Sequence, residues 1–171
     1  MAIDAINEAI DKLARTLAEH PEKARVKNTS ATASLHDGLK FQIAGPRGER
    51  VETDMPQAFG GAAGGPAPGW LLRAALSSCT ATVIAMRAAR LGVALHTLEV
   101  TVESESDNRG LLGLDDKVSA GLLGLRTAVR ISAANADAEQ LREIVRWADE
   151  HSPIACTLRE AREMGIDIEV V

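Results

Sequence analysis

Residues 68–92 read PGWLLRAALSSCTATVIAMRAARLG and contain the longest helical pattern in the chain. Apolar side chains recur at the spacing of an α-helix, and Gly92 suits the left-handed residue that often ends a helix. The segment therefore predicts a helix over residues 70–91 that is apolar on more than one side and occupies a buried, central position. One stripe of this helix comprises Leu72, Leu76, Cys79, Val83, Met86 and Arg90.

The segment upstream of this helix predicts a small antiparallel meander. Apolar residues alternate over residues 39–43, directly after Asp37-Gly38, and Asp-Gly beside such a run is typical of a two-residue type I′ hairpin turn. A second turn over residues 45–48 leads into another short strand. Residues 59–69 are rich in glycine and proline, which oppose regular structure, so they predict a flexible loop.

Two further strands are predicted downstream of the helix. Apolar and polar residues alternate over residues 98–102 and 125–131, which is typical of half-buried strands. The polar positions include glutamates in the first segment and arginines in the second. If the two strands are antiparallel neighbours, each cross-strand Glu–Arg pair adds about 0.2–1 kcal/mol. The connection over residues 107–124 is too long for a tight turn and is a candidate functional loop.

The C-terminal part of the chain predicts two helices and a strand. Asp137 and Gln140 resemble a capping box at the start of a helix. Residues 151–153 break that helix, and Pro153 can open the next one because proline suits the first helical position. Residues 166–170 alternate between apolar and acidic side chains and predict a final strand.

The length of the chain predicts one main domain, over residues 24–171. It is preceded by an extension over residues 1–23, in which an amphipathic helical pattern ends at His20-Pro21. A chain of 171 residues is large enough to bury its own core without disulfide bonds.

Composition excludes several classes of function. The net charge is −5 and only 2% of the residues are aromatic, so neither basic patches nor stacking rings favour nucleic-acid binding. Arg73, Arg87 and Arg90 interrupt the best candidate for a membrane-spanning segment. The acidic N-terminal segment does not resemble a secretion signal. We therefore expect a cytoplasmic protein without a nucleic-acid or membrane partner.

Few side chains in the sequence could carry chemistry. Cys79 and Cys156 are the two cysteines, too few for a disulfide scaffold or a four-thiolate zinc site, so a pairing between them would indicate redox chemistry. The four histidines lack metal-ligand spacing, and the glycine-rich loop lacks the Lys-Ser/Thr that ends a phosphate-binding loop. We therefore expect no metal and no bound cofactor.

Two motifs resemble a known family. Residues 68–81, PGWLLRAALSSCTA, resemble the proline-led LLxAALxxCTA helix start of the OsmC/Ohr family of bacterial thiol peroxidases. Residues 148–154, ADEHSPI, resemble its second motif, in which a cysteine precedes Pro-Val or Pro-Ile. The likeness runs from about residue 26 to the C-terminus. It implies an α+β fold of curved antiparallel sheets packed on central helices, in an intertwined homodimer with a thiol site near the subunit interface.

The resemblance also implies a reaction. In the family the first cysteine attacks the O–O bond of an organic hydroperoxide, the second resolves the sulfenic acid as a disulfide, and an external dithiol supplies electrons. Cys79 matches the first cysteine. Ser152 occupies the position of the second, and Cys156 lies one helical turn further on, where it is a candidate substitute resolver. For both cysteines the alternative is a structural role as a small buried apolar residue.

A thiol nucleophile needs a nearby positive charge. A free cysteine has a pKa of about 8.5 and is mostly protonated at neutral pH, so the thiolate must be stabilised. The resemblance implies an arginine from the early sheet, for which Arg25, Arg47 and Arg50 are candidates. It also implies a glutamate that orients this arginine, but the glutamate position falls at Gly69 or Trp70, which carry no carboxylate.

Two functions of different classes follow. The first is a thiol-dependent peroxidase that reduces organic hydroperoxides through Cys79. The second is a catalytically degenerate OsmC-like dimer that binds a small molecule in a pocket under the glycine-rich loop. The missing glutamate and Ser152 favour the second function, whereas Cys79 within its motif favours the first, which we prefer.

Overall fold

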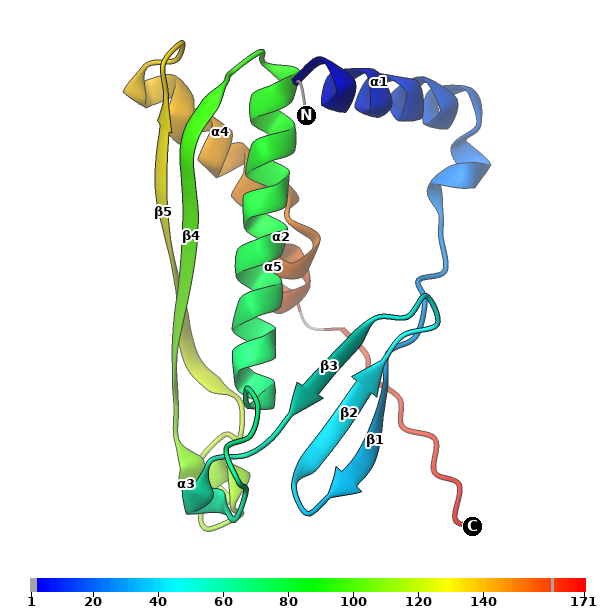
Figure 1. The fold of residues 1–171 in the computed structure, drawn as a ribbon, viewed down its shortest axis with the longest axis vertical. Coiled ribbons are helices and arrows are strands. Elements are labelled where there is room, and N and C mark those ends of the chain that lie inside the picture. The colour runs from blue at the N-terminus through cyan, green and yellow to red at the C-terminus, as the bar shows by residue number, and fades with distance from the viewer. Residues whose placement is uncertain (1–2, 161) are drawn as a thin grey trace. The chain divides into compact units, whose positions relative to one another are not determined.

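The computed structural model describes residues 3–160 and 162–171 of the chain. It has the α+β architecture that the sequence predicts, with antiparallel sheets and helices (Figure 1). Contacts within the chain define two compact units, one of Ala5–Ala75 and one of Leu76–Val171 together with the start of the chain through Asp4, each with its own sheet. This division does not test the boundary expected between residues 23 and 24, which stays a prediction.

The N-terminal unit contains a three-stranded antiparallel sheet in the order β1-β2-β3. The predicted N-terminal helix and the predicted meander are both present. The elements are α1 Ile3–Glu19, a 3₁₀ turn Pro21–Ala24, β1 Thr32–Asp37, β2 Lys40–Ala44, β3 Arg50–Thr53 and a second 3₁₀ turn Gln57–Phe59.

The β1–β2 hairpin turn lies one residue further along the chain than predicted. Asp37 pairs with Lys40, so the two central residues of the turn are Gly38 and Leu39. Of these only Gly38 has a positive φ, +53°, which fits a type II′ turn rather than the predicted type I′ turn. The ladder is irregular between Leu35 and Asp37, and this irregularity shifts the register of the turn.

A buried carboxylate holds the glycine-rich loop. Asp54 follows β3 and is 2% exposed. It accepts hydrogen bonds from the backbone N–H groups of Met55 at 2.8 Å, Ala62 at 3.1 Å and Gly64 at 2.9 Å. The N–H of Gly64, followed by those of Met55 and Ala62, lowers the pKa of Asp54. The predicted loop is therefore tied to one side chain, a contact that the sequence reasoning did not anticipate.

The C-terminal unit combines the rest of the long helix with a two-stranded antiparallel sheet. Its elements are α2 Pro68–Arg90, which begins in the N-terminal unit, β4 Leu95–Ser106, α3 Asn108–Leu111, β5 Leu122–Ala133, α4 Ala138–His151 and α5 Pro153–Arg159. The side chains of the core come from α2 and α4 and from the turn after α2, and are Ile84, Ala88, Val93, Leu141, Ile144 and Ala148.

The buried face of α2 differs from the predicted stripe. The residues buried at intervals of one helical turn are Leu76, Thr80, Ile84 and Ala88. The helix packs its core contacts against α4, so Leu72 and Met86 stay 37% and 41% exposed. By length and composition alone, α2 is long and apolar enough to cross a membrane. Arg73, Arg87 and Arg90 had indicated that it is not a membrane-spanning segment. The core helices of soluble proteins also meet these two criteria.

The pairing of β4 with β5 confirms the predicted charge complementarity. Glu99 lies opposite Arg130 and Glu103 lies opposite Arg126 in the antiparallel register. The ion pairs measure 3.3 Å between Arg130 and Glu99 and 3.9 Å between Arg126 and Glu103. Both pairs are exposed, so they specify the register of the hairpin more than they stabilise it.

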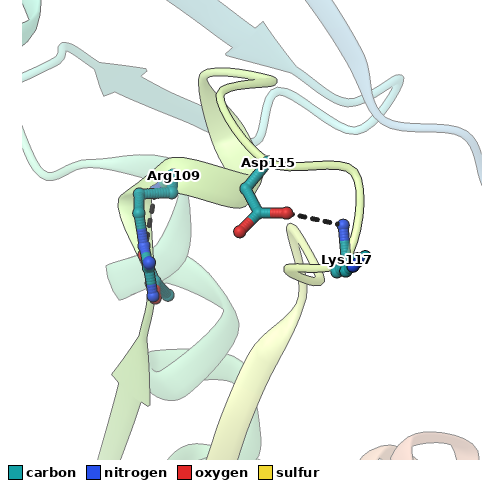
Figure 2. Close-up of polar contacts among 4 residues, drawn as sticks. Arg109, Asp115 and Lys117 are labelled. Atoms are coloured by element: carbon teal, nitrogen blue, oxygen red, sulfur yellow. Dashed lines mark hydrogen bonds and ion pairs between the residues drawn. The ribbon is translucent and has the colours of Figure 1, made fainter.

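The β4–β5 connection is a structured loop that contains the short helix α3, which the sequence reasoning missed. Asp107 caps α3, accepting the backbone N–H of Arg109 at 3.0 Å and pairing with its guanidinium. This guanidinium lowers the pKa of Asp107 to about 2. Figure 2 shows Arg109, Asp115 and Lys117 in this loop, where the Asp115 carboxylate accepts the backbone N–H of Lys117 at 3.0 Å.

The C-terminal strand predicted over residues 166–170 is absent. Residues 162–171 form no helix or strand, and Ile166, Ile168 and Val170 are each more than four fifths exposed. A strand is stabilised by the hydrogen-bond ladder it shares with a neighbour, and within the described residues this segment pairs with no strand.

The predicted cap at the start of α4 is confirmed, since the Asp137 side chain accepts the backbone N–H of Gln140 at 2.8 Å.

Candidate active site around Cys79

Cys79 lies in the middle of α2, next to the buried stripe of that helix. It follows Leu76 by about one turn and precedes the buried Thr80. Its side chain is half-buried and its thiol is free. The core contacts of α2 with α4 fix the helix, so the sulfur occupies a defined position that is still within reach of solvent.

Ser152 brings a hydroxyl to this sulfur. It lies between α4 and α5, where Pro153 opens α5, and it is completely buried. Its Oγ donates a hydrogen bond to the Sγ of Cys79 at 3.3 Å and accepts the backbone N–H of Ala155 at 3.4 Å. Ser152 is therefore the N-cap of α5, and its hydrogen bond to Cys79 is a contact that the sequence did not predict. A serine before proline at the second-motif position is the signal that could have suggested it.

Cys156 occupies a different environment from Cys79. It lies on α5, is half-buried, and is also a free thiol. Its Sγ donates a hydrogen bond to the carbonyl oxygen of Glu150 at 3.2 Å. The two cysteines thus approach the same helix junction, with Cys79 bonded to Ser152 and Cys156 bonded to the end of α4.

Arg159 is a cation of the same unit that the sequence reasoning did not single out. Its guanidinium pairs with the Asp149 carboxylate and donates to the Asp149 carbonyl at 2.9 Å. Asp149 is the main cause of the raised pKa of Arg159, and Cys156 and Glu150 act in the same direction. The charge of Arg159 is therefore directed toward α4 and contributes to the electrostatics around Cys156.

A pocket of about 260 Å³ adjoins these groups. It is lined by side chains of α2, β5, α4 and α5, namely Leu76, Leu125, Thr127, Asp149, Ala155, Leu158 and Arg159. Neither Cys79 nor Ser152 lines this pocket, but Leu76 lies about one turn before Cys79 on α2 and the backbone N–H of Ala155 donates to Ser152. The pocket lining combines apolar side chains with Thr127 and the Asp149–Arg159 ion pair, a combination suited to a small amphipathic molecule.

A family model described as OsmC-like protein matches residues 60–167, a range that includes Cys79, Ser152 and Cys156. The chain belongs to the OsmC-like protein family. The sequence resemblance to that family is therefore confirmed. A comparison with curated protein sequences finds no significant match.

Solved structures share the fold of this OsmC-like chain. An OsmC-like protein from Mycoplasma pneumoniae has a TM-score of 0.67 at 17% identity, over 79% of this chain and 89% of its own. An organic hydroperoxide resistance protein OsmC from Legionella pneumophila has a TM-score of 0.59 at 20% identity, over 79% and 91%. The organic hydroperoxide resistance protein OhrB of Bacillus subtilis has a TM-score of 0.52 at 19% identity, over 79% and 93%. At these identities the likeness shows the fold alone.

The OsmC-like chain differs from the expected activating machinery. Arg25, Arg47 and Arg50 belong to the N-terminal unit, whereas Cys79 belongs to the C-terminal unit. That one of these arginines stabilises the Cys79 thiolate therefore stays a prediction. Gly69 and Trp70 lie in the first turn of α2, which contains no acidic residue. Within residues 3–160 and 162–171, no group of three or more His, Cys, Asp or Glu side chains is arranged to hold a metal ion.

Proposed function

We propose that this OsmC-like chain is a thiol-dependent peroxidase that reduces organic hydroperoxides with Cys79 as the nucleophile. The observation that carries the proposal is the contact between the half-buried Cys79 Sγ and the buried Ser152 hydroxyl at 3.3 Å. Membership of the family and the two hydroperoxide resistance proteins among the similar structures support the substrate class. The apolar side chains of the pocket that Leu76 and Ala155 line offer a surface to an alkyl group.

The proposed reaction is a displacement at oxygen. The Cys79 thiolate attacks the terminal oxygen of the hydroperoxide, an S–O bond forms, and the O–O bond breaks. Cys79 is oxidised to a sulfenic acid, and the departing alkoxide takes a proton to become an alcohol. A hydrogen-bond donor at the sulfur favours this step because it stabilises the thiolate, which is the reactive form.

A second thiol completes the cycle. It attacks the sulfenic acid, forms a disulfide with Cys79 and releases water, and an external dithiol then returns Cys79 to the thiol. We keep Cys156 as the candidate second thiol within the chain, since it lies on the helix that Ser152 caps. Its sulfur would have to leave the Glu150 carbonyl to reach Cys79.

The assembly and the activating cation are part of the same proposal. Family members are typically dimeric, and we expect a cytoplasmic homodimer that needs no bound cofactor. An arginine of the N-terminal unit, Arg25, Arg47 or Arg50, supplies the positive charge for the thiolate.

A catalytically degenerate binding module is the second candidate. It is favoured by one observation, the first turn of α2, where Gly69 and Trp70 stand in place of the glutamate that would orient the arginine. In that case the pocket lined by Leu76, Ala155 and Leu158, rather than the one expected under the glycine-rich loop, would bind a small molecule without turnover.

The experiment that tests the proposal follows peroxide and sulfur together. Reduced protein is mixed with one equivalent of tert-butyl hydroperoxide, and peroxide loss and intact mass are recorded for wild type, Cys79→Ser and Cys156→Ser. We expect rapid peroxide loss in wild type and reaction at the background rate of a free thiol in Cys79→Ser. Cys156→Ser is the matched control because it removes the other thiol.

Each outcome of this experiment has a defined meaning. A disulfide in wild type that Cys156→Ser eliminates supports Cys156 as the resolver. A sulfenic acid in wild type, with peroxide loss retained in Cys156→Ser, supports a cycle that uses only Cys79 and external thiols. Peroxide loss no faster than that of free cysteine in wild type overturns the peroxidase and leaves the binding module.

A further inference from the structure

The Ser152 hydroxyl has one proton and a geometry that directs it. A hydroxyl offers one donor and two acceptor positions. The backbone N–H of Ala155 uses an acceptor position at 3.4 Å, and the proton points to the Sγ of Cys79 at 3.3 Å. Ser152 is completely buried, so no exposed face of the residue competes for this proton. A thiolate can only accept, and a hydrogen bond to an ionised acceptor is stronger than one between neutral groups.

Helix capping alone does not require this donor. Asp, Asn, Ser and Thr all cap helices because a side-chain oxygen accepts a backbone N–H. Asp137 caps α4 in this way with a carboxylate that has no proton to donate. At position 152 an ionised aspartate would cap α5 equally well but would place a negative charge against the sulfur. Of these four, only Ser, Thr and Asn can accept from the helix and donate to Cys79 at once.

We infer that Ser152 is a positioning residue for Cys79: its hydroxyl orients the sulfur and stabilises the thiolate by a direct hydrogen bond. The inference rests on the proposed function, since it assigns the group that prepares the proposed nucleophile. It also has a consequence for the resolution of the sulfenic acid. Oxygen cannot join a disulfide, so position 152 holds the sulfur without resolving its sulfenic acid, and the thiol that forms the S–S bond and releases water comes from elsewhere.

The test measures thiolate formation without peroxide. In a Cys156→Ser background Cys79 is the only thiol, and its alkylation by iodoacetamide is followed from pH 5 to pH 10, since only the thiolate reacts. With Ser152→Ala the pH–rate profile should move up by about one unit, which lowers the rate at pH 7 about tenfold. With Ser152→Thr, which keeps the hydroxyl, the profile should stay close to that of the parent.

Asp137→Ala is the matched control, because it also removes an N-cap but leaves the contact with Cys79 intact. Its alkylation profile should equal that of the parent. The inference is overturned if Ser152→Ala leaves the profile unchanged, or if Asp137→Ala moves it as far. Because iodoacetamide replaces the hydroperoxide, a failure of peroxidase activity does not affect the result, and the two proposals fail separately.

A second variant covers the case in which Ser152→Ala does not fold. Ser152→Cys, again with Cys156→Ser, places a sulfur where the Oγ now lies 3.3 Å from Cys79. Diamide, which takes two electrons and two protons from a pair of thiols, should then close a disulfide between Cys79 and the introduced thiol, with a mass loss of about 2 Da. Two thiols that remain free and alkylatable after diamide would show that the two positions are not in contact, against the inference.

Discussion

Two residues of the N-terminal unit, Asp54 and Gly61, order the glycine-rich loop over residues 59–69. The Asp54 carboxylate binds three backbone N–H groups, and the chain passes so close to itself that a Cβ on Gly61 would lie 1.9 Å from the carbonyl oxygen of Met55. Glycine is required at this position for close approach, not for an unusual φ. The loop leads directly into α2, so its order bears on the helix that carries Cys79.

This contact predicts different outcomes for two neighbouring substitutions. Gly61→Ala must displace backbone and should lower the unfolding midpoint by several degrees, since a clash of this kind costs roughly 1–3 kcal/mol. Gly64→Ala is the control, because its Cβ would meet the Asp54 Oδ2 at 3.4 Å, an ordinary contact. Thermal unfolding followed by circular dichroism measures both. Equal midpoints for the two variants would contradict the close approach seen at Gly61.

At the level of elements, the sequence could predict what local pattern determines. The alternation of apolar and charged residues predicted that β4 pairs with β5, and the structure places Glu99 opposite Arg130. Capping chemistry gave the start of α4 at Asp137. By contrast, which face of α2 is buried depends on where α4 packs, and an apolar helix carries no local signal for that choice. The Ser152–Cys79 contact joins residues 73 positions apart, so only the fold could place them together.

The β4–β5 loop contributes stability that depends on pH. The Arg109 side chain lowers the pKa of Asp107 from 3.8 to about 2 in the folded protein. A carboxylate whose folded pKa is depressed stabilises the fold fully above its unfolded pKa, and this contribution is lost as pH falls through the folded value. The loss attributable to Asp107 should therefore occur between about pH 4 and pH 2.

Urea unfolding from pH 6 to pH 2.5 measures this contribution. Asp107→Asn should be less stable than wild type at pH 6, and the difference should shrink as the pH falls below 4. Arg109→Gln should show the same convergence, because it removes the main cause of the shift. A stability difference between wild type and Asp107→Asn that stays constant down to pH 2.5 would rule out the Asp107–Arg109 pair as its source.

Over the whole molecule, apolar surface is left exposed at the C-terminus. Ile166, Ile168 and Val170 are 85%, 83% and 90% exposed, and they alternate with the acidic Asp167 and Glu169. Apolar side chains that gather on the surface of a soluble protein mark interaction sites, and the alternation is typical of a strand with one buried face. Together with the dimer that we expect from the family, these features favour burial of the segment in a second copy of the chain.

Burial of this segment in a dimer can be tested by substituting its apolar and its acidic residues separately. Replacing Ile166, Ile168 and Val170 together by serine should raise the dimer dissociation constant at least tenfold, because burial of each such side chain is worth about 1.5–3 kcal/mol and 1.4 kcal/mol corresponds to a factor of ten. Replacing Asp167 and Glu169 by serine is the matched control and should weaken the dimer far less, since these side chains would occupy the other face of the strand. Sedimentation equilibrium over micromolar concentrations measures both variants. A wild-type monomer, or a triple variant that dimerises as tightly as wild type, would mean that the C-terminal segment has another role.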